Sequence, residues 1–198
     1  MARFRTELRR KYIHLIGLTV PVLYGLVGLG WGWRVGQEAT LLFTAFFLLL
    51  FIAFEPYRIR HGIPVKKAAD IAKPLMRSQE KRGIGGHIFF AAGAFIAVLA
   101  YPQEIAIAVI LMSTLADGGA AVVGSRWGKH KLVGKKTIEG SLTLFLIALA
   151  LAALLVKPLL AAFVGAIVAV FVELLPMNDN LTIPVAAGLA MYAVRYFS

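Results

Sequence analysis

Seven apolar stretches, separated by short polar or charged segments, constrain the fold of this chain more than any other feature. A helix of about 20 residues crosses the ~30 Å hydrocarbon core of a bilayer. With 60% hydrophobic residues and a mean hydropathy of +0.79, the chain has more apolar surface than a soluble core can bury. We therefore predict an all-α, polytopic integral membrane protein with about seven transmembrane helices. The predicted spans are residues 12–29, 39–54, 84–101, 105–124, 142–156, 159–172 and 181–197.

The distribution of Lys and Arg predicts the orientation. With the N-terminus in the cytoplasm, residues 1–11, 55–83, 125–141 and 173–180 lie on the cytoplasmic side and hold 18 of the 21 Lys and Arg residues. Loops rich in these residues stay in the cytoplasm. We therefore expect a cytoplasmic N-terminus and an external C-terminus. The basic N-terminal segment resembles that of a signal peptide, but no small-residue cleavage site follows, so the first apolar stretch is interpreted as a retained span.

Net charge and cysteine content exclude several classes of function. The net charge of +11 is concentrated in the predicted cytoplasmic loops, which favours an anionic membrane surface and phosphate ligands over nucleic acid. There is no cysteine, so disulfides, thiolate metal sites and a cysteine nucleophile are excluded.

The loops define one transmembrane domain over residues 1–198. Residues 55–83 form the longest loop, in which apolar side chains alternate with cations; we expect an interfacial amphipathic helix there, broken near Pro74. Residues 117–141 form a second, glycine-rich loop.

Asp117 stands near the end of the fourth predicted span, directly before Gly118 and Gly119. Acids within the bilayer are costly and usually functional. Glycines next to cations suit phosphate binding, because they let a phosphate approach the backbone closely. This pattern predicts a metal-bound nucleotide at a membrane surface. Thr137 and Ser141 have a second interpretation, since Thr-Ile-Glu-Gly-Ser also fits the start of a helix.

Other acids lie near the same predicted face. Glu173 ends an apolar run, and Asp179 follows it in a polar turn. Mg²⁺ prefers oxygen ligands, usually one or two carboxylates together with nucleotide phosphates. Asp117, Glu173 and Asp179 are therefore the candidate metal ligands and catalytic acids. No spacing among the four histidines indicates a zinc site.

Four separated motifs resemble those of the CTP-dependent lipid-alcohol kinases, a family that comprises dolichol kinase, phytol kinase and the CTP-using diacylglycerol kinase. They are Arg10-Lys-Tyr-Ile-His14, Glu80-Lys-Arg-Gly83, the stretch from Asp117 to Ser141, and Glu173 with residues 178–184. Phosphatidate cytidylyltransferases are similar too, but their C-terminal Asp-Arg-x-Asp element is absent. Here the corresponding stretch reads Met177-Asn-Asp-Asn-Leu, which favours the kinases.

The resemblance implies a kinase domain that transfers the γ-phosphate of CTP, with Mg²⁺, to a hydroxyl of a membrane lipid. The acceptor is of the polyprenol or dolichol, phytol or geranylgeraniol, or diacylglycerol type. Asp117 then holds Mg²⁺ or accepts the hydroxyl proton, and the sequence does not choose between these roles. The nucleotide-binding residues would be Lys81, Arg82, Gly118, Gly124, Arg126, Gly128, Lys129, Lys131, Lys135, Lys136, Thr137 and Glu139. The lipid-acceptor side would comprise Lys11, His14, Asn178 and Asn180.

Two other functions remain alternatives. One is cytidylyl transfer from CTP to phosphatidate, which releases pyrophosphate. The other is transport of ions by the intramembrane acids, which predicts acids at the midplane and internal repeats; no repeat is evident. The expected location is a prokaryotic cytoplasmic membrane or an endomembrane, with the site on the cytoplasmic face. The sequence leaves open whether the chain acts alone or as a homodimer.

Overall fold

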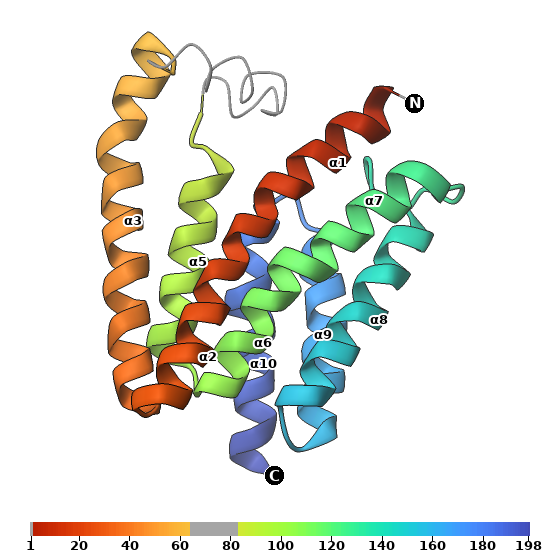
Figure 1. The fold of residues 1–198 in the computed structure, drawn as a ribbon. Helices are drawn as coiled ribbons and strands as arrows, with labels where there is room; N and C mark the ends of the chain where they lie inside the picture. Colours follow the sequence, from red (N-terminus) through yellow and green to blue (C-terminus); the bar gives the residue numbers. More distant parts are fainter. Residues whose placement is uncertain (1, 64–82) are drawn as a thin grey trace.

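Seven helical rods build the part of the molecule that the structure describes (Figure 1). The computed structural model describes residues 2–63 and 83–198, apart from the side chains of residues 2, 3 and 5–7. The first rod joins α1 (Ala2–His14), the 3₁₀ turn η1 (Leu15–Leu18) and α2 (Thr19–Trp31), and the second is α3 (Trp33–His61). Next come α5 (Gly86–Ala100) and a rod of α6 (Gln103–Leu111), the π-helical turn η2 (Met112–Ala116) and α7 (Asp117–Trp127). The last three are α8 (Ile138–Leu155), α9 (Leu159–Glu173) and α10 (Asp179–Phe197).

Each predicted span coincides with one of these rods; most ends differ by a few residues, but α3 is six to seven residues longer at each end and the first rod begins ten residues earlier than predicted. Four segments are long and apolar enough to cross a membrane, namely Leu8–Trp31, Trp33–His61, Gln103–Trp127 and Ile138–Leu155, while α5 and α9 are shorter apolar helices. In the described ranges there is no β-strand, only one isolated bridge between Lys131 and Thr137. The prediction of an all-α polytopic membrane protein is confirmed. The number of spans and the orientation stay predictions.

Both predicted loops are shorter in the structure. Helix α3 continues through Pro56 to His61, because Arg58 pairs with Glu55 one turn earlier and Gly62, at φ 82°, ends the helix. Most of the predicted amphipathic helix, with Pro74, lies outside the described residues. Residues 125–127, predicted as loop after the span 105–124, continue α7 (Asp117–Trp127), so the connection to α8 is limited to residues 128–137.

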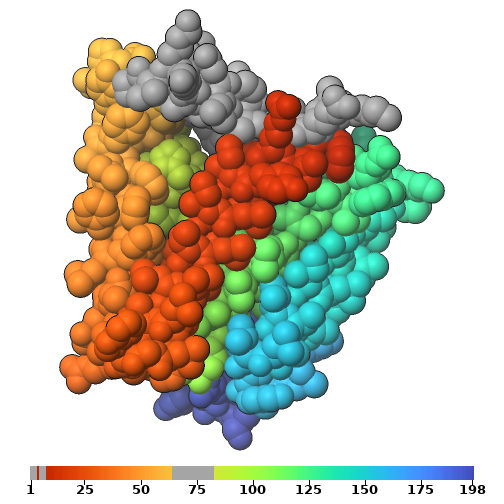
Figure 2. Space-filling model, viewed as in Figure 1, coloured from red at the N-terminus to blue at the C-terminus, as the bar shows by residue number. Residues whose placement is uncertain are grey.

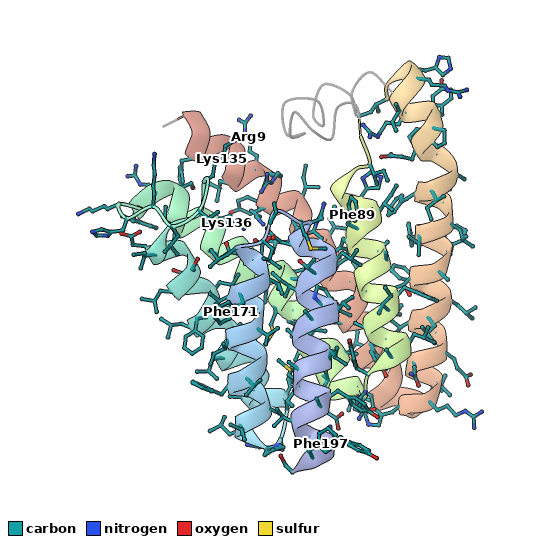
Figure 3. All side chains as sticks on the ribbon, turned by 180° about the vertical axis from the view of Figure 1, so that it is seen from behind. Arg9, Phe89, Lys135, Lys136, Phe171 and Phe197 are labelled. Carbon is teal, nitrogen blue, oxygen red and sulfur yellow. The ribbon has the colours of Figure 1, made fainter. Side chains whose placement is uncertain are left out.

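Small side chains pack the helices tightly in the core. Helix α9 buries a row of small residues, Ala161, Ala162, Gly165, Ala166 and Ala169, and a Cβ on Gly165 would collide with the side chain of Met191 on α10. Small residues let helix backbones approach closely where lipid gives no hydrophobic drive for association. Larger apolar side chains point outward, as Phe171 (67% exposed) and Phe197 (85% exposed) do in Figure 3, and this surface suits the hydrocarbon of a bilayer.

The first rod and α3 form a V that narrows at Gly32 (Figure 1). At the narrow end the two rods nearly touch, since a Cβ on Gly36 would lie 2.8 Å from Cα of Gly28. Toward the other end, α1 packs on α7, while α3 packs on α5. The rods therefore diverge toward the end of the molecule where α1 begins and where α7 connects to α8.

Candidate active site

Asp117 lies at a change of helix type inside the membrane-spanning rod α6–η2–α7. The π-helical turn Met112–Ala116 precedes it, and Asp117 begins α7. Such wide turns are rare and often occur at functional sites. The carboxylate is buried and forms an ion pair with the ammonium of Lys11 on α1, whose side chain is 10% exposed. Lys11, predicted on the lipid-acceptor side, is thus in direct contact with the central acid.

Lys136 joins the two other acids. Its Nζ lies 2.8 Å from Oε1 of Glu173 and 2.8 Å from Oδ2 of Asp179. Glu173 is the last residue of α9 and Asp179 the first of α10, so the short turn between these helices holds both acids beside the loop. Ser141 on α8 donates a hydrogen bond of 3.0 Å to Oε2 of Glu173, which fixes the second carboxylate oxygen.

The ion pairs of Lys11 and those of Lys136 belong to one electrostatic cluster. Burial lowers the pKa of Lys136, but the carboxylates of Asp179, Asp117 and Glu173 raise it more, so its pKa is above the ordinary value for lysine. Lys136 therefore carries its positive charge at neutral pH. Three carboxyl groups therefore share two ammonium groups in this cluster.

The fit of Mg²⁺ to this cluster follows from its donor atoms. Carboxylate oxygens are the ligands that Mg²⁺ takes, and phosphate oxygens usually supply several of the remaining positions. Across residues 2–63 and 83–198, no three Asp, Glu or His side chains stand close enough together to hold a metal ion by themselves. The two ammonium groups pair with these carboxylates instead. The cluster therefore suits a Mg²⁺ ion that is bound jointly by one or two of its carboxylates and by the phosphates of a nucleotide.

The predicted nucleotide-binding residues divide into two groups. Lys136 is in the cluster, whereas Lys129, Lys131 and Lys135 are exposed and their side chains make no hydrogen bond or ion pair with a described residue. Figure 3 shows Lys136 deeper in the molecule than Lys135. Arg126 is exposed at the end of α7, with its guanidinium 5.6 Å from the centre of the Phe4 ring. Lys81 and Arg82 lie outside the described residues.

Local structure accounts for several other predicted residues. Thr137 caps α8, since its hydroxyl accepts a hydrogen bond from the Gly140 N–H. Glu139 accepts a hydrogen bond of 2.8 Å from His130 and thereby closes the 128–137 loop on itself, away from the three acids.

The predicted glycines differ in their surroundings. A Cβ on Gly124 would lie 2.9 Å from the Thr137 hydroxyl, and one on Gly128 would lie 2.7 Å from the same atom. Close packing of α7 against the start of α8 therefore explains both glycines. A Cβ on Gly118 would meet no atom of the described residues within 4 Å, so close packing does not explain this glycine.

A cavity of about 460 Å³ opens beside Asp117. One end is polar, and all four residues predicted on the lipid-acceptor side line it. His14 contacts the Ser113 carbonyl oxygen at 3.1 Å, and Asn180 donates a hydrogen bond of 3.1 Å to the Gly86 carbonyl. The charged, histidine and amide residues that line the cavity are Arg10, Lys11, His14, His87, Asp117, Asn178, Asp179 and Asn180, and Thr19 and Thr44 add two hydroxyl groups to the wall. The rest of the wall is mostly apolar.

Two features were missed from the sequence. Ser141 was a candidate helix cap, but it contacts Glu173, and nothing local in the sequence indicates a partner 32 positions away. The cavity wall includes Phe43, Phe47, Phe51 and Phe90, which the sequence shows only as apolar residues of predicted spans. Their spacing of four residues along α3 was the available signal, since it places Phe43, Phe47 and Phe51 on one face.

The fold and the site define a polytopic membrane protein with a buried acid–lysine centre at the wall of an apolar cavity. The chain is 32% identical to the CTP-dependent diacylglycerol kinase 1 of Schizosaccharomyces pombe (strain 972 / ATCC 24843) over 212 residues, which cover 95% of this chain and 93% of that protein. It therefore belongs to the family of CTP-dependent lipid kinases. An uncharacterized protein of Rickettsia prowazekii (strain Madrid E) is 27% identical over 208 residues, covering 98% of this chain and 97% of that protein. No protein-family model and no solved structure matches the chain.

Proposed function

We propose that this kinase transfers the γ-phosphoryl group of CTP to the hydroxyl of a membrane lipid alcohol, at the cytoplasmic face of the membrane. One observation carries the proposal: Lys11, Asp117 and Asp179 line the polar end of an apolar cavity, and Lys136 and Glu173 adjoin this group through the ion pairs of Lys136 with Asp179 and Glu173. Phosphoryl transfer needs this combination, because its catalysis consists mainly of positioning and of neutralising phosphate charge.

The proposed reaction forms a bond between the acceptor oxygen and the γ-phosphorus and breaks the bond from that phosphorus to the β,γ-bridging oxygen. CDP leaves with the electron pair of the broken bond. The hydroxyl proton passes to a carboxylate of the cluster, and Asp117 is the candidate because it lines the cavity. Lys136 neutralises phosphate charge, and Glu173, fixed by Ser141, holds Lys136 in place.

Asp179 would hold Mg²⁺ together with nucleotide phosphates and leave Asp117 free to accept the proton, since both border the cavity and their carboxylates are close enough to influence one another electrostatically. The ion would neutralise negative charge on the phosphates when it is bound. Binding of a magnesium nucleotide would also give Lys11 and Lys136 new anionic partners, the phosphate oxygens, in place of the carboxylates.

The proposal leaves the identity of the acceptor lipid to be determined by experiment. The name of the Schizosaccharomyces pombe relative specifies diacylglycerol as its substrate, so diacylglycerol is the first acceptor to test. Polyprenol or dolichol and phytol or geranylgeraniol are the other members of the class, because each presents one hydroxyl at the end of an apolar chain.

The test is an assay of purified protein in detergent with Mg²⁺ and γ-³²P-labelled CTP or ATP. Diacylglycerol, phytol, geranylgeraniol and longer polyprenols serve as acceptors in separate reactions. The expected products are a labelled lipid phosphate and CDP, with CTP preferred over ATP. Release of pyrophosphate and formation of a CDP-lipid from phosphatidate, without transfer to any alcohol, would contradict the proposal and identify a cytidylyltransferase.

A further inference from the structure

The apolar part of the cavity lies between the two arms of the V formed by α3 and the first rod. On α3, Phe43, Phe47 and Phe51 follow one another at four-residue spacing, with ring centres 4.8 Å and 5.8 Å apart. At 1.5 Å per residue this aromatic row covers ~12 Å of the helix. The Phe51 ring then lies 4.8 Å from the ring of His87 on α5, near the polar end of the cavity.

The facing wall is also apolar. Ile13, Ile16 and Val20 of the first rod line it, and Phe90 and Ala91 of α5 lie between the two arms. The Phe90 ring packs edge-on against His14 at 5.4 Å, so the apolar wall continues directly into the polar end. Thus a molecule in this cavity would meet hydrocarbon surface along most of its length and charged groups at one end.

The opening of the cavity determines what can enter it. Figure 2 shows α5 visible between α3 and the first rod, so this side of the molecule is hollowed there. Both arms of the V are long and apolar enough to cross a membrane, so we expect the gap between them to face lipid. Moving a polar nucleotide between apolar walls costs free energy, because its polar groups lose water and find no partners there. An acyl or isoprenyl chain only exchanges contacts with lipid for contacts with the aromatic rings, at little cost in free energy.

We propose that this cavity binds the acceptor lipid, which enters sideways from the bilayer between α1 and α3. The first ~12 Å of its chain lies along Phe43, Phe47 and Phe51, and its hydroxyl reaches Asp117 and Lys11. This inference rests on the proposed lipid-alcohol kinase activity. It goes further in two ways. It assigns residues that determine the affinity for the acceptor lipid, and it places the distal part of the lipid's hydrocarbon chain in the membrane.

Two matched pairs of variants test the site. Ile16→Trp adds bulk at the cavity wall, and Leu26→Trp adds the same bulk to the same rod at an equally exposed position, 66%, that does not line the cavity. Phe47→Ala removes a wall residue, and Phe46→Ala removes its outward-facing neighbour, which is 61% exposed. Ile16→Trp and Phe47→Ala should each raise the acceptor KM about tenfold, a factor in keeping with a change in the size and shape of an apolar pocket, and leave the KM for CTP unchanged within about twofold. The control variants should retain wild-type constants.

A direct binding measurement complements the kinetics. A diacylglycerol with a diazirine in one acyl chain should label residues within 13–20, 43–51 and 86–91, and unlabelled diacylglycerol should compete. Equal labelling by a diazirine phosphatidylcholine, without that competition, would indicate a general lipid site and overturn the proposal.

The outcomes for the two proposals are separable. If the wild-type protein phosphorylates no lipid alcohol, the proposed function fails. If it is active and Ile16→Trp and Phe47→Ala behave like their controls, only the acceptor site is wrong.

Discussion

Lys11 on the first helix is paired with Asp117, 106 residues later in the chain, and both side chains are at most 10% exposed. The pair ties the N-terminal helix to the helix that begins with the central acid. The first helix is thus part of the site and its wall, in addition to any role of its cations in setting membrane orientation.

The first prediction concerns the Lys11–Asp117 pair. Lys11→Met leaves a buried carboxylate without its partner, and loss of one partner from a buried pair costs about 3–5 kcal/mol. We expect a markedly lower Tm in detergent and loss of kinase activity. Adding Asp117→Asn removes the uncompensated charge and should restore part of the Tm but no activity. If the Tm of Lys11→Met equals that of wild type, the pair contributes nothing to folding.

The second prediction concerns Asp117 alone. Asp117→Asn keeps the shape of the side chain but removes its charge and its ability to accept a proton. We expect kcat to fall by about 10²–10⁴-fold, the range for loss of a general base, in a protein that still elutes as folded material. Glu104→Gln serves as the control, because Glu104 pairs with Arg195 and is remote from the site; its activity should match wild type. Substantial activity of Asp117→Asn would remove Asp117 from the catalytic groups.

The third prediction compares two neighbouring lysines. Lys136 contacts Glu173 and Asp179, while Lys135 is exposed. Lys136→Met should lower kcat/KM for CTP by about 10²-fold or more, in keeping with loss of a charge-assisted contact. Lys135→Met should change it only a few-fold, with a difference that disappears at high salt, because exposed charges are screened. Equal losses in both variants would show that the burial of Lys136 has no bearing on nucleotide binding.

The fourth prediction concerns pH. The pKa of Lys136 is raised in the folded protein because, although burial lowers it, Asp179, Asp117 and Glu173 raise it more. A group whose pKa is raised by folding contributes its full stabilisation below its unfolded pKa, about 10.4, and loses it as pH rises through the folded value. The difference in Tm between wild type and Lys136→Met should stay constant from about pH 7 to 9.5 and decrease only above about pH 10.4. A decrease near pH 8 would contradict the raised pKa.

Much of the fold could be predicted because the bilayer imposes a simple rule on sequence. Every backbone polar group must be paired within the hydrocarbon, so long apolar runs become helices, and the seven predicted spans coincide with seven helical rods. The ends of the loops were harder to predict, because polar composition does not show where a helix stops. Residues 117–127 are rich in glycine and polar side chains at their ends, yet they form α7, held by close packing on α8 at Gly119 and Gly124.

The acids of the candidate site were visible in the sequence, but their contacts were not. An acid within or at the end of an apolar run is costly, and this cost identified Asp117 and Glu173. Lys135 and Lys136 were indistinguishable as adjacent cations of one loop, and only the structure shows Lys136 between Glu173 and Asp179.

The sequence by itself determined the helices and the chemical types of the site residues, because apolar runs and misplaced charges are local properties of the chain. Tertiary structure decided which charges are paired and where the apolar cavity lies. Those features depend on how far rigid helices diverge and on contacts between residues as distant as Lys11 and Asp117, for which the linear sequence holds no local signal.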